Sequence, residues 1–211
     1  MTIEVFDYRR DVRNIFVSSQ MRSRFLRMEP GQQADLHSHD LGHEIFLILQ
    51  GRARFEISGE VADLGPGQAC FALAHEPHRV SVIGGEPMTM YLSVTPHVQP
   101  THTGRTEDGG RLPVRFQPSS AYDVEEDPAP AVELLAGFLD LSEELASAAA
   151  TAAGEQREAG ARLREALAAG DEEAAGRHRE AMWLGLRGVM EKLHEAAEQW
   201  NRLAPRAGKT G

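Results

Sequence analysis

The stretch GQQADLHSHDLGHEIFLILQG, residues 31–51, decides the fold. His37 and His39 stand two residues apart, and Glu44 opens a strongly apolar segment after a short Asp-Leu-Gly turn. Residues i and i+2 of a β-strand lie on the same face, so a strand here directs both imidazoles to one side, about 7 Å apart. Two imidazoles and a carboxylate suit a divalent transition-metal ion and leave positions open for a substrate. The stretch therefore predicts a metal site carried by β-structure.

A second histidine group, His75-Glu76-Pro77-His78, stands at the start of a later predicted strand. We expect His78 to supply a fourth metal ligand. His75 is a candidate acid–base residue at the mouth of the cavity, because histidine titrates near neutral pH. The alternative for His75 is a solvated loop residue with no role.

Other residues near these motifs are expected to lie outside the site. His43 neighbours Glu44, so on a strand it faces the opposite way. His97 and His102 follow the last predicted strand and are expected to be exposed. Arginines in the predicted strands would anchor a carboxylate if they faced inward, but a solvated strand face is the favoured interpretation for Arg24, Arg52, Arg54 and Arg79.

Around the motifs, short apolar runs alternate with glycine- and proline-rich turns and have no helix between them. Such spacing is typical of an antiparallel sandwich or barrel. The predicted strands cover residues 15–17, 22–28, 44–49, 53–57, 68–73, 78–83 and 89–94. Residues 100–118 contain few large apolar side chains and are expected to form a surface loop or a strap along the barrel. We assign residues 1–120 to this domain, with its core at about 11–97.

After residue 128 the sequence becomes rich in alanine, glutamate, leucine and arginine. Apolar residues recur at alternating steps of three and four, which predicts a coiled-coil-like seam. The predicted seam consists of Phe138, Leu141, Leu145, Ala148 and Ala152 in a first helix and Met182, Leu186, Val189, Leu193, Ala196, Trp200 and Leu203 in a second. Gly170 and Asp171 supply a stop and an N-cap between the two helices. Residues 129–205 are therefore expected to form an antiparallel helical hairpin that packs on the barrel or on a second subunit.

Composition narrows the class of protein. A net charge of −10 over 211 residues argues against nucleic acid or an anionic membrane as the main partner. The single cysteine, Cys70, lies in an apolar run and is expected to be a buried thiol. The N-terminal residues carry no apolar segment of a secretory signal, which favours a cytoplasmic protein.

The residues of the deciding stretch resemble the first motif of the cupin family, in which a glycine, a His-any-His pair, a glutamate and a second glycine follow at set spacings. The positions are filled here by Gly31, His37, His39, Glu44 and Gly51. A second motif resembles Gly59…Pro66-Gly67…His78, although its first spacing is one residue longer and Val82 stands where the family has asparagine. The resemblance covers about residues 11–97. It implies a mainly β protein, a jelly-roll barrel with the metal in its cavity, here followed by the helical tail.

The resemblance also frames the expected function. Cupins include dioxygenases, isomerases, decarboxylases and lyases as well as storage proteins and sugar-binding regulators, so the fold does not give the function. We expect one divalent ion per chain, with Fe(II), Mn or Ni favoured over Zn or Cu, and dioxygenase chemistry slightly favoured over isomerase or lyase chemistry. The alternative is a binding or sensing module without catalysis. A homodimer is expected, and the cavity wall is assigned to Phe46, Ile48, Phe55 and Tyr91.

Overall fold

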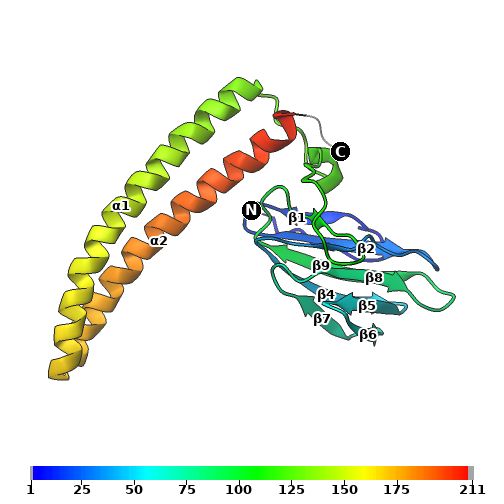
Figure 1. Ribbon diagram of the computed structural model, residues 1–211, viewed down its shortest axis with the longest axis horizontal. Helices are drawn as coiled ribbons and strands as arrows, with labels where there is room; N and C mark the ends of the chain where they lie inside the picture. The colour runs from blue at the N-terminus through cyan, green and yellow to red at the C-terminus, as the bar shows by residue number, and fades with distance from the viewer. Residues whose placement is uncertain (1, 209–211) are drawn as a thin grey trace. The chain divides into compact units, whose positions relative to one another are not determined.

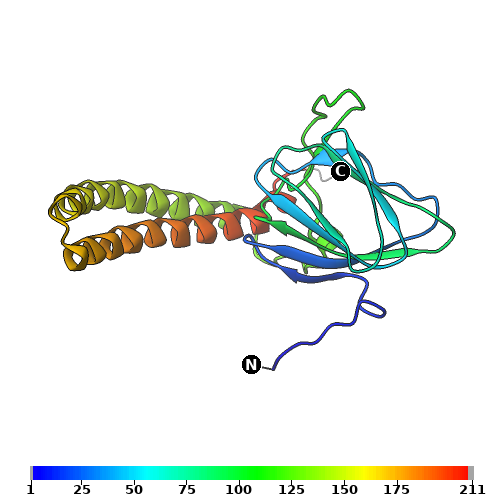
Figure 2. The same ribbon diagram turned by 90° about the horizontal axis from the view of Figure 1, so that it is seen from below.

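Short strands with alternating buried and exposed side chains form two antiparallel sheets of five strands each. The first sheet has the order β1 (Asn14–Val17), β2 (Arg22–Met28), β9 (Met88–Thr95), β4 (His43–Gln50) and β7 (Ala69–Ala72). The second has the order β10 (Thr103–Gly104), β3 (His37–Ser38), β8 (His78–Val82), β5 (Ala53–Ile57) and β6 (Glu60–Leu64). In this computed structural model, which describes residues 2–208, the two sheets form the expected jelly-roll barrel (Figures 1 and 2).

The interior of the barrel is divided between an apolar core and a polar site. On β4, Glu44, Phe46 and Ile48 are buried, whereas the alternate residue Ile45 is half exposed. Burying one face of each sheet fixes its register, because a slip by one residue would exchange the buried and exposed sets. The core consists of Met28, Phe46, Ile48, Ala53, Phe55, Leu64, Ala72, Val80, Val82, Met88, Met90 and Leu92.

The seven strands predicted from the sequence are confirmed to within two residues at each end. Three strands were missed. β6 carries Glu60, Ala62 and Asp63 on an exposed edge with only Leu64 buried, so its sequence lacks the alternation of a half-buried strand. β3 and β10 have two residues each, which is too short for any periodic signal. The strap that follows β9 contains β10 and ends in a 3₁₀ helix, Ser119–Tyr122.

The chain divides into two units, and Pro128–Leu203 form the second. Its helices are α1 (Ala131–Ala169) and α2 (Glu172–Leu203), and a short 3₁₀ helix, Ala204–Arg206, follows in the first unit. Gly170 ends α1 in the left-handed conformation, and the backbone N–H of Ala174 donates to Oδ1 of Asp171, as expected of an N-cap. The predicted helical hairpin is therefore confirmed.

The predicted seam is confirmed only in part: Ala152, Ala196 and Leu203 are buried as expected, but other members are not. Leu186 and Leu193 are 51% and 45% exposed, so they lie outside the surface buried between the helices. The buried residues of α1 include Ala152, Ala159 and Ala166, spaced seven apart, and α2 contributes the small Ala196. Small side chains allow the helices to approach closely, and the periodicity alone did not say which members of the seam are buried.

None of the described helices is both long enough and apolar enough to span a membrane.

Gly51, between β4 and β5, occupies a position where only glycine fits. Its φ is +71°, and a Cβ there would overlap the carbonyl oxygen of Pro87 and lie 2.8 Å from Cα of Met88. Gly59 has a similar φ of +85°, but a Cβ added there would meet nothing within 4 Å. We expect Gly59→Ala to lower the free energy of unfolding by about 1–2 kcal/mol from backbone strain alone. Gly51→Ala should cost about 3 kcal/mol or more, because backbone must also move. Urea denaturation of both variants measures this, and equal costs would contradict the close approach.

Candidate metal centre

Four potential ligands from three strands and one connecting loop meet inside the barrel. His37 on β3 is the direct cross-strand partner of His78 on β8, and His39 follows β3. Glu44 comes from β4 in the opposite sheet. One ligand atom from each of the four side chains lies within 4.8 Å of the others, and His39, Glu44 and His78 are buried. The structure therefore brings together the four residues that the sequence assigned to the metal.

Each imidazole is held by a backbone carbonyl group at Nδ1. The distances are 2.9 Å from His37 to the oxygen of Asp35, 2.6 Å from His39 to that of Thr101, and 2.9 Å from His78 to that of Glu76. A carbonyl oxygen only accepts, so Nδ1 must carry the proton in all three rings. In a neutral imidazole the lone pair is then on Nε2, the usual arrangement for a histidine that binds a metal.

The Nε2 lone pairs approach a carboxylate that also has only lone pairs to offer. Oε2 of Glu44 lies 2.8 Å from Nε2 of His39 and 3.1 Å from Nε2 of His78. Protonating both rings would relieve the repulsion, but it would add two positive charges to an interior that already contains Arg22 and Arg24. A divalent cation satisfies every lone pair at once, and cis ligands about 2.1 Å from one ion are about 3 Å apart. The donor set thus fits a metal ion.

The pKa shifts agree with this chemistry. Burial alone would raise the pKa of Glu44, but hydrogen bonds with His39 and His78 outweigh burial and lower the pKa well below its ordinary value. These bonds require a proton on each Nε2, and a metal ion would supply the positive charge in place of those protons. Burial, followed by repulsion from His78, lowers the pKa of His37 to about 4. At neutral pH the site therefore presents a carboxylate and a neutral imidazole, which are the protonation states that metals bind.

His102 corrects one expectation from the sequence. It was expected to be exposed, but its ring centroid lies 5.0 Å from that of His37 and 4.8 Å from that of His39. Burial, followed by repulsion from His37 and His39, holds its pKa well below the ordinary value. His102 was missed because it lies on the strap, whose position over the cavity has no signal in the local sequence.

His97 is a second correction, because it is buried rather than exposed. Its Nδ1 lies 2.9 Å from the hydroxyl oxygen of Thr101, and its ring meets Tyr122 edge-on at a centroid distance of 4.7 Å. Burial, followed by repulsion from Arg22, lowers the pKa of His97 to about 3. It therefore supports the strap as a neutral side chain.

His75, the candidate acid–base residue, lies at the surface. Its side chain is 64% exposed, with Nδ1 3.8 Å from a carboxylate oxygen of Asp40, and it lines neither cavity described below. Its backbone N–H donates to the carbonyl oxygen of His39, which helps to place that ligand. His43 is exposed, as predicted from strand parity, and accepts a hydrogen bond from the N–H of Ala74.

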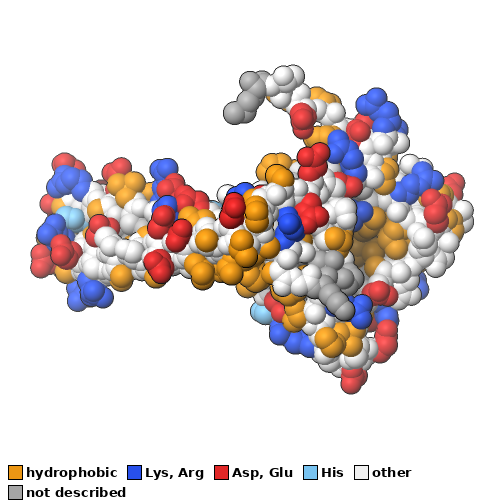
Figure 3. Space-filling model, turned by 90° about the horizontal axis from the view of Figure 1, so that it is seen from above, with side chains coloured by type: hydrophobic (Ala, Val, Ile, Leu, Met, Phe, Trp, Pro, Cys, Tyr) orange, Lys and Arg blue, Asp and Glu red, His pale blue; other side chains and the backbone are white. Residues whose placement is uncertain are grey.

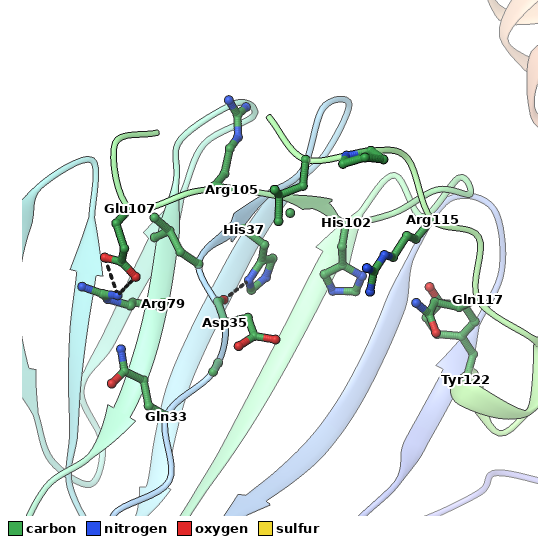
Figure 4. Close-up of a pocket in the computed structure, with 15 residues that line it drawn as sticks. Gln33, Asp35, His37, Arg79, His102, Arg105, Glu107, Arg115, Gln117 and Tyr122 are labelled. Carbon is green, nitrogen blue, oxygen red and sulfur yellow. Dashed lines mark hydrogen bonds and ion pairs between the residues drawn. The ribbon is translucent and has the colours of Figure 1, made fainter. Parts of the chain in front are cut away.

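Two neighbouring cavities, which share lining residues, adjoin the site. An inner cavity of about 360 Å³ is lined by Glu44, His37, His78 and His102 together with apolar residues of both sheets. An outer cavity of about 790 Å³ shares His37, His102 and Tyr122 with it and has the strap as one wall (Figure 4). The strap is anchored by Arg105, whose guanidinium donates two hydrogen bonds, of 2.8 and 3.0 Å, to the hydroxyl oxygen of Ser38.

The predicted cavity wall is partly corrected. Phe46 lines the inner cavity, but Ile48 and Phe55 are fully buried in the apolar core and line neither cavity. Tyr91 lies on the other face of β9, where its hydroxyl group is 3.0 Å from that of Ser23. Its neighbours Met90 and Leu92 line the cavity instead, as strand parity requires. Cys70 is half-buried against the core, and burial, with the nearby charge of Glu44, raises the pKa of its thiol to about 11.

Two arginines line the inner cavity as well. Arg24 faces inward, contrary to the solvated face that the sequence favoured, and Arg22, two residues before it, does the same. Their i, i+2 spacing on one predicted strand was the sequence signal that could have placed both side chains on the same face. In contrast, Arg54 pairs with Asp63 at the surface, as expected.

Comparison with known proteins finds similarity to the barrel. A family model described as a cupin domain matches residues 24–95. Similar solved structures include TT1209 from Thermus thermophilus, with 27% identity and a TM-score of 0.43 over 44% of this chain and 98% of that one. A conserved protein with a double-stranded β-helix domain from Klebsiella pneumoniae has 21% identity and a TM-score of 0.43, covering 45% of this chain and 91% of that one. No curated protein matches the sequence.

The lone-pair argument predicts that each chain binds one divalent ion. His78→Gln should reduce the affinity for Zn(II) or Mn(II) at least about 100-fold, because it removes a ligand rather than an outer partner. His75→Gln is the matched control and should keep the affinity of the unaltered protein. Competition with a chromophoric chelator measures both, and equal affinities in the two variants would contradict the assignment.

The depressed pKa of His97 predicts acid sensitivity. Between its ordinary value near 6.5 and about 3, the unfolded chain takes up a proton that the folded protein excludes, so stability is lost as the pH falls. We expect His97→Gln to lose about 2 kcal/mol less unfolding free energy than the unaltered protein between pH 6 and pH 4. Denaturant titrations at both pH values test this, with His75→Gln as the control. Parallel losses in all three proteins would show that His97 is protonated in the folded state.

Proposed function

Because residues 24–95 are a cupin domain, we propose that this chain holds one divalent transition-metal ion through His37, His39, Glu44 and His78 and acts there on a small organic molecule. The observation that carries the proposal is the convergence of three Nε2 lone pairs and a carboxylate beside a cavity. Four protein ligands leave two positions free on an ion that prefers six, and Fe(II), Mn and Ni are such ions. When bound, the ion would supply Lewis-acid chemistry or, as Fe(II), activation of dioxygen.

The residues of the chain have separate tasks in this proposal. Leu26, Phe46, Met90 and Leu92 provide an apolar surface for the body of the bound molecule. His102, which lines both cavities, takes the acid–base role that was expected of His75 and exchanges a proton with that molecule. Gln117 and Tyr122 come from the strap and its 3₁₀ helix and limit access of water to the inner cavity. A cytoplasmic location suits both Fe(II) and the single free thiol.

Dioxygenase activity is favoured over isomerase or lyase activity. We expect anaerobic reconstitution with Fe(II), followed by oxygen-electrode measurements on a panel of catechols, thiols and keto acids, to find oxygen uptake with at least one class. His78→Gln should abolish the uptake, and His75→Gln should retain it. No turnover with Fe(II), Mn or Ni, together with tight binding of an unchanged ligand, would contradict catalysis and identify a binding or sensing module.

We also propose that α2 mediates a homodimer. Its exposed apolar residues Trp183, Leu186, Met190 and Leu193 follow steps of three, four and three, next to the buried face. The spacing is symmetric about Gly188, so an antiparallel second copy places Trp183 opposite Leu193 and Leu186 opposite Met190. Gly188 has open space around it, which permits close approach at the centre. Figure 3 shows hydrophobic side chains between the charged ones along the hairpin.

This symmetry gives a sharp test of the dimer. Leu186→Glu places two like charges at the centre of the antiparallel contact and should convert the protein to a monomer in sedimentation equilibrium. Leu184→Glu is the control, because Leu184 is similarly exposed on α2 but lies off the stripe. A dimer that survives Leu186→Glu, or a monomer before substitution, would overturn this role for the stripe.

A further inference from the structure

Two arginines on the wall of the inner cavity, one buried and one partly buried, have no assigned role. Arg22 and Arg24 lie two residues apart on β2, so both side chains point to the interior, and both line the cavity with Glu44 and His78. Arg22 is only 3% exposed. The Nε atoms of both arginines are buried and have no hydrogen-bond partner among the described residues.

Leaving a buried guanidinium without partners is unfavourable. Arginine carries five N–H donors and stays charged, so burial removes its hydration without a replacement. Arginine is rarely buried unless it is paired, and a buried charge without a partner destabilises the folded protein. A ligand of opposite charge would supply the missing partner.

Glu44 does not supply the missing partner. Glu44 attracts Arg22 through its charge, but Nε of Arg22 has no hydrogen-bond partner among the described residues. Oε2 of Glu44 is occupied by His39 and His78. Asp123 is the carboxylate that attracts Arg24 most strongly, but it already accepts two hydrogen bonds of 2.8 Å from Asn14.

The balance of charge calls for an anion. Two guanidinium groups and a divalent ion bring four positive charges into one cavity, against the single negative charge of Glu44. The ring of Tyr122 lies 5.4 Å from the guanidinium carbon of Arg22, an interaction that restricts the orientation of the group. In contrast, Arg79, which also lines the cavity, is already paired with Glu56 and Glu107.

We propose that Arg22 and Arg24 form a carboxylate-binding subsite, so that the molecule in the cavity is a small organic acid with an apolar body. The planar fork of a guanidinium matches the two oxygens of a carboxylate. The surrounding Leu26, Phe46, Met90 and Leu92 fit the apolar body of an organic acid. The inference rests on the proposed function, because it names the class of substrate for that site.

The test uses the chain of 211 residues in two forms, metal-free and loaded with Zn(II). The probes are phenylacetate and its neutral analogue phenylacetamide. We expect calorimetry to detect binding of phenylacetate. The amide should bind at least about tenfold more weakly. Arg22→Gln should weaken the binding of phenylacetate at least about tenfold, because it removes charge-assisted hydrogen bonds. The affinity of Arg22→Lys should lie between those of the unaltered protein and Arg22→Gln. Arg27→Gln is the matched control: Arg27 is on the same strand but exposed and paired with Glu29, so the affinity should not change.

The outcomes separate this inference from the proposed function. Metal content is measured for every variant. Arginine-dependent binding of phenylacetate to a protein that takes up no metal would support the subsite and refute the metal-dependent function. Three results in a protein that takes up metal would overturn the carboxylate subsite. They are equal affinity for the acid and the amide, no effect of Arg22→Gln on phenylacetate binding, and arginine-dependent binding of inorganic phosphate that is tighter than that of phenylacetate.

A stability measurement covers the case in which binding of the probe is too weak to detect. In the Zn(II)-loaded protein without added anion, Arg22→Met should raise the unfolding temperature, because it removes an unpaired buried charge. Phenylacetate should raise the unfolding temperature of the unaltered protein but not that of Arg22→Met. A lower unfolding temperature for Arg22→Met, without stabilisation of either protein by phenylacetate, would overturn the proposal.

Discussion

The rest of the structure depends on one electrostatic constraint: three imidazole lone pairs and a carboxylate are held together where water cannot solvate them. Backbone carbonyl groups fix the proton on Nδ1 of His37, His39 and His78 and so direct each Nε2 inward. Glu44 completes the set from the opposite sheet. Only a cation balances these groups without further charges, and the pairing of the sheets positions the ligands before any ion binds.

The sequence predicted the site better than its surroundings. His37, His39, Glu44 and His78 were identifiable because their spacing is local to two motifs, and the strands around them alternate clearly. His102, Arg24 and Tyr91 were not placed correctly, for different reasons. The position of His102 depends on where the strap crosses the barrel. Arg24 looked like any arginine on an exposed strand, and placing Tyr91 required knowing which face of β9 its side chain occupies.

The helical hairpin shows the same limit. The alternation of three and four residues predicted both helices and the turn at Gly170 and Asp171. It did not say which members of the predicted seam on α2 are buried. Ala196 and Leu203 are buried, whereas Leu186 and Leu193 of the same seam are about half exposed, so periodicity alone does not locate the buried face.

The barrel therefore combines a stable apolar half with a polar half that carries strain from unpaired charge, as expected of a binding site. The most direct test of the central claim is a crystal of the Mn(II)-loaded protein with anomalous diffraction data. The account predicts one anomalous peak bound by the Nε2 atoms of His37, His39 and His78 and a carboxylate oxygen of Glu44, with every Nδ1 still on its carbonyl group. A peak elsewhere, or a centre in which Glu44 is bridged to protonated imidazoles with no ion, would contradict it.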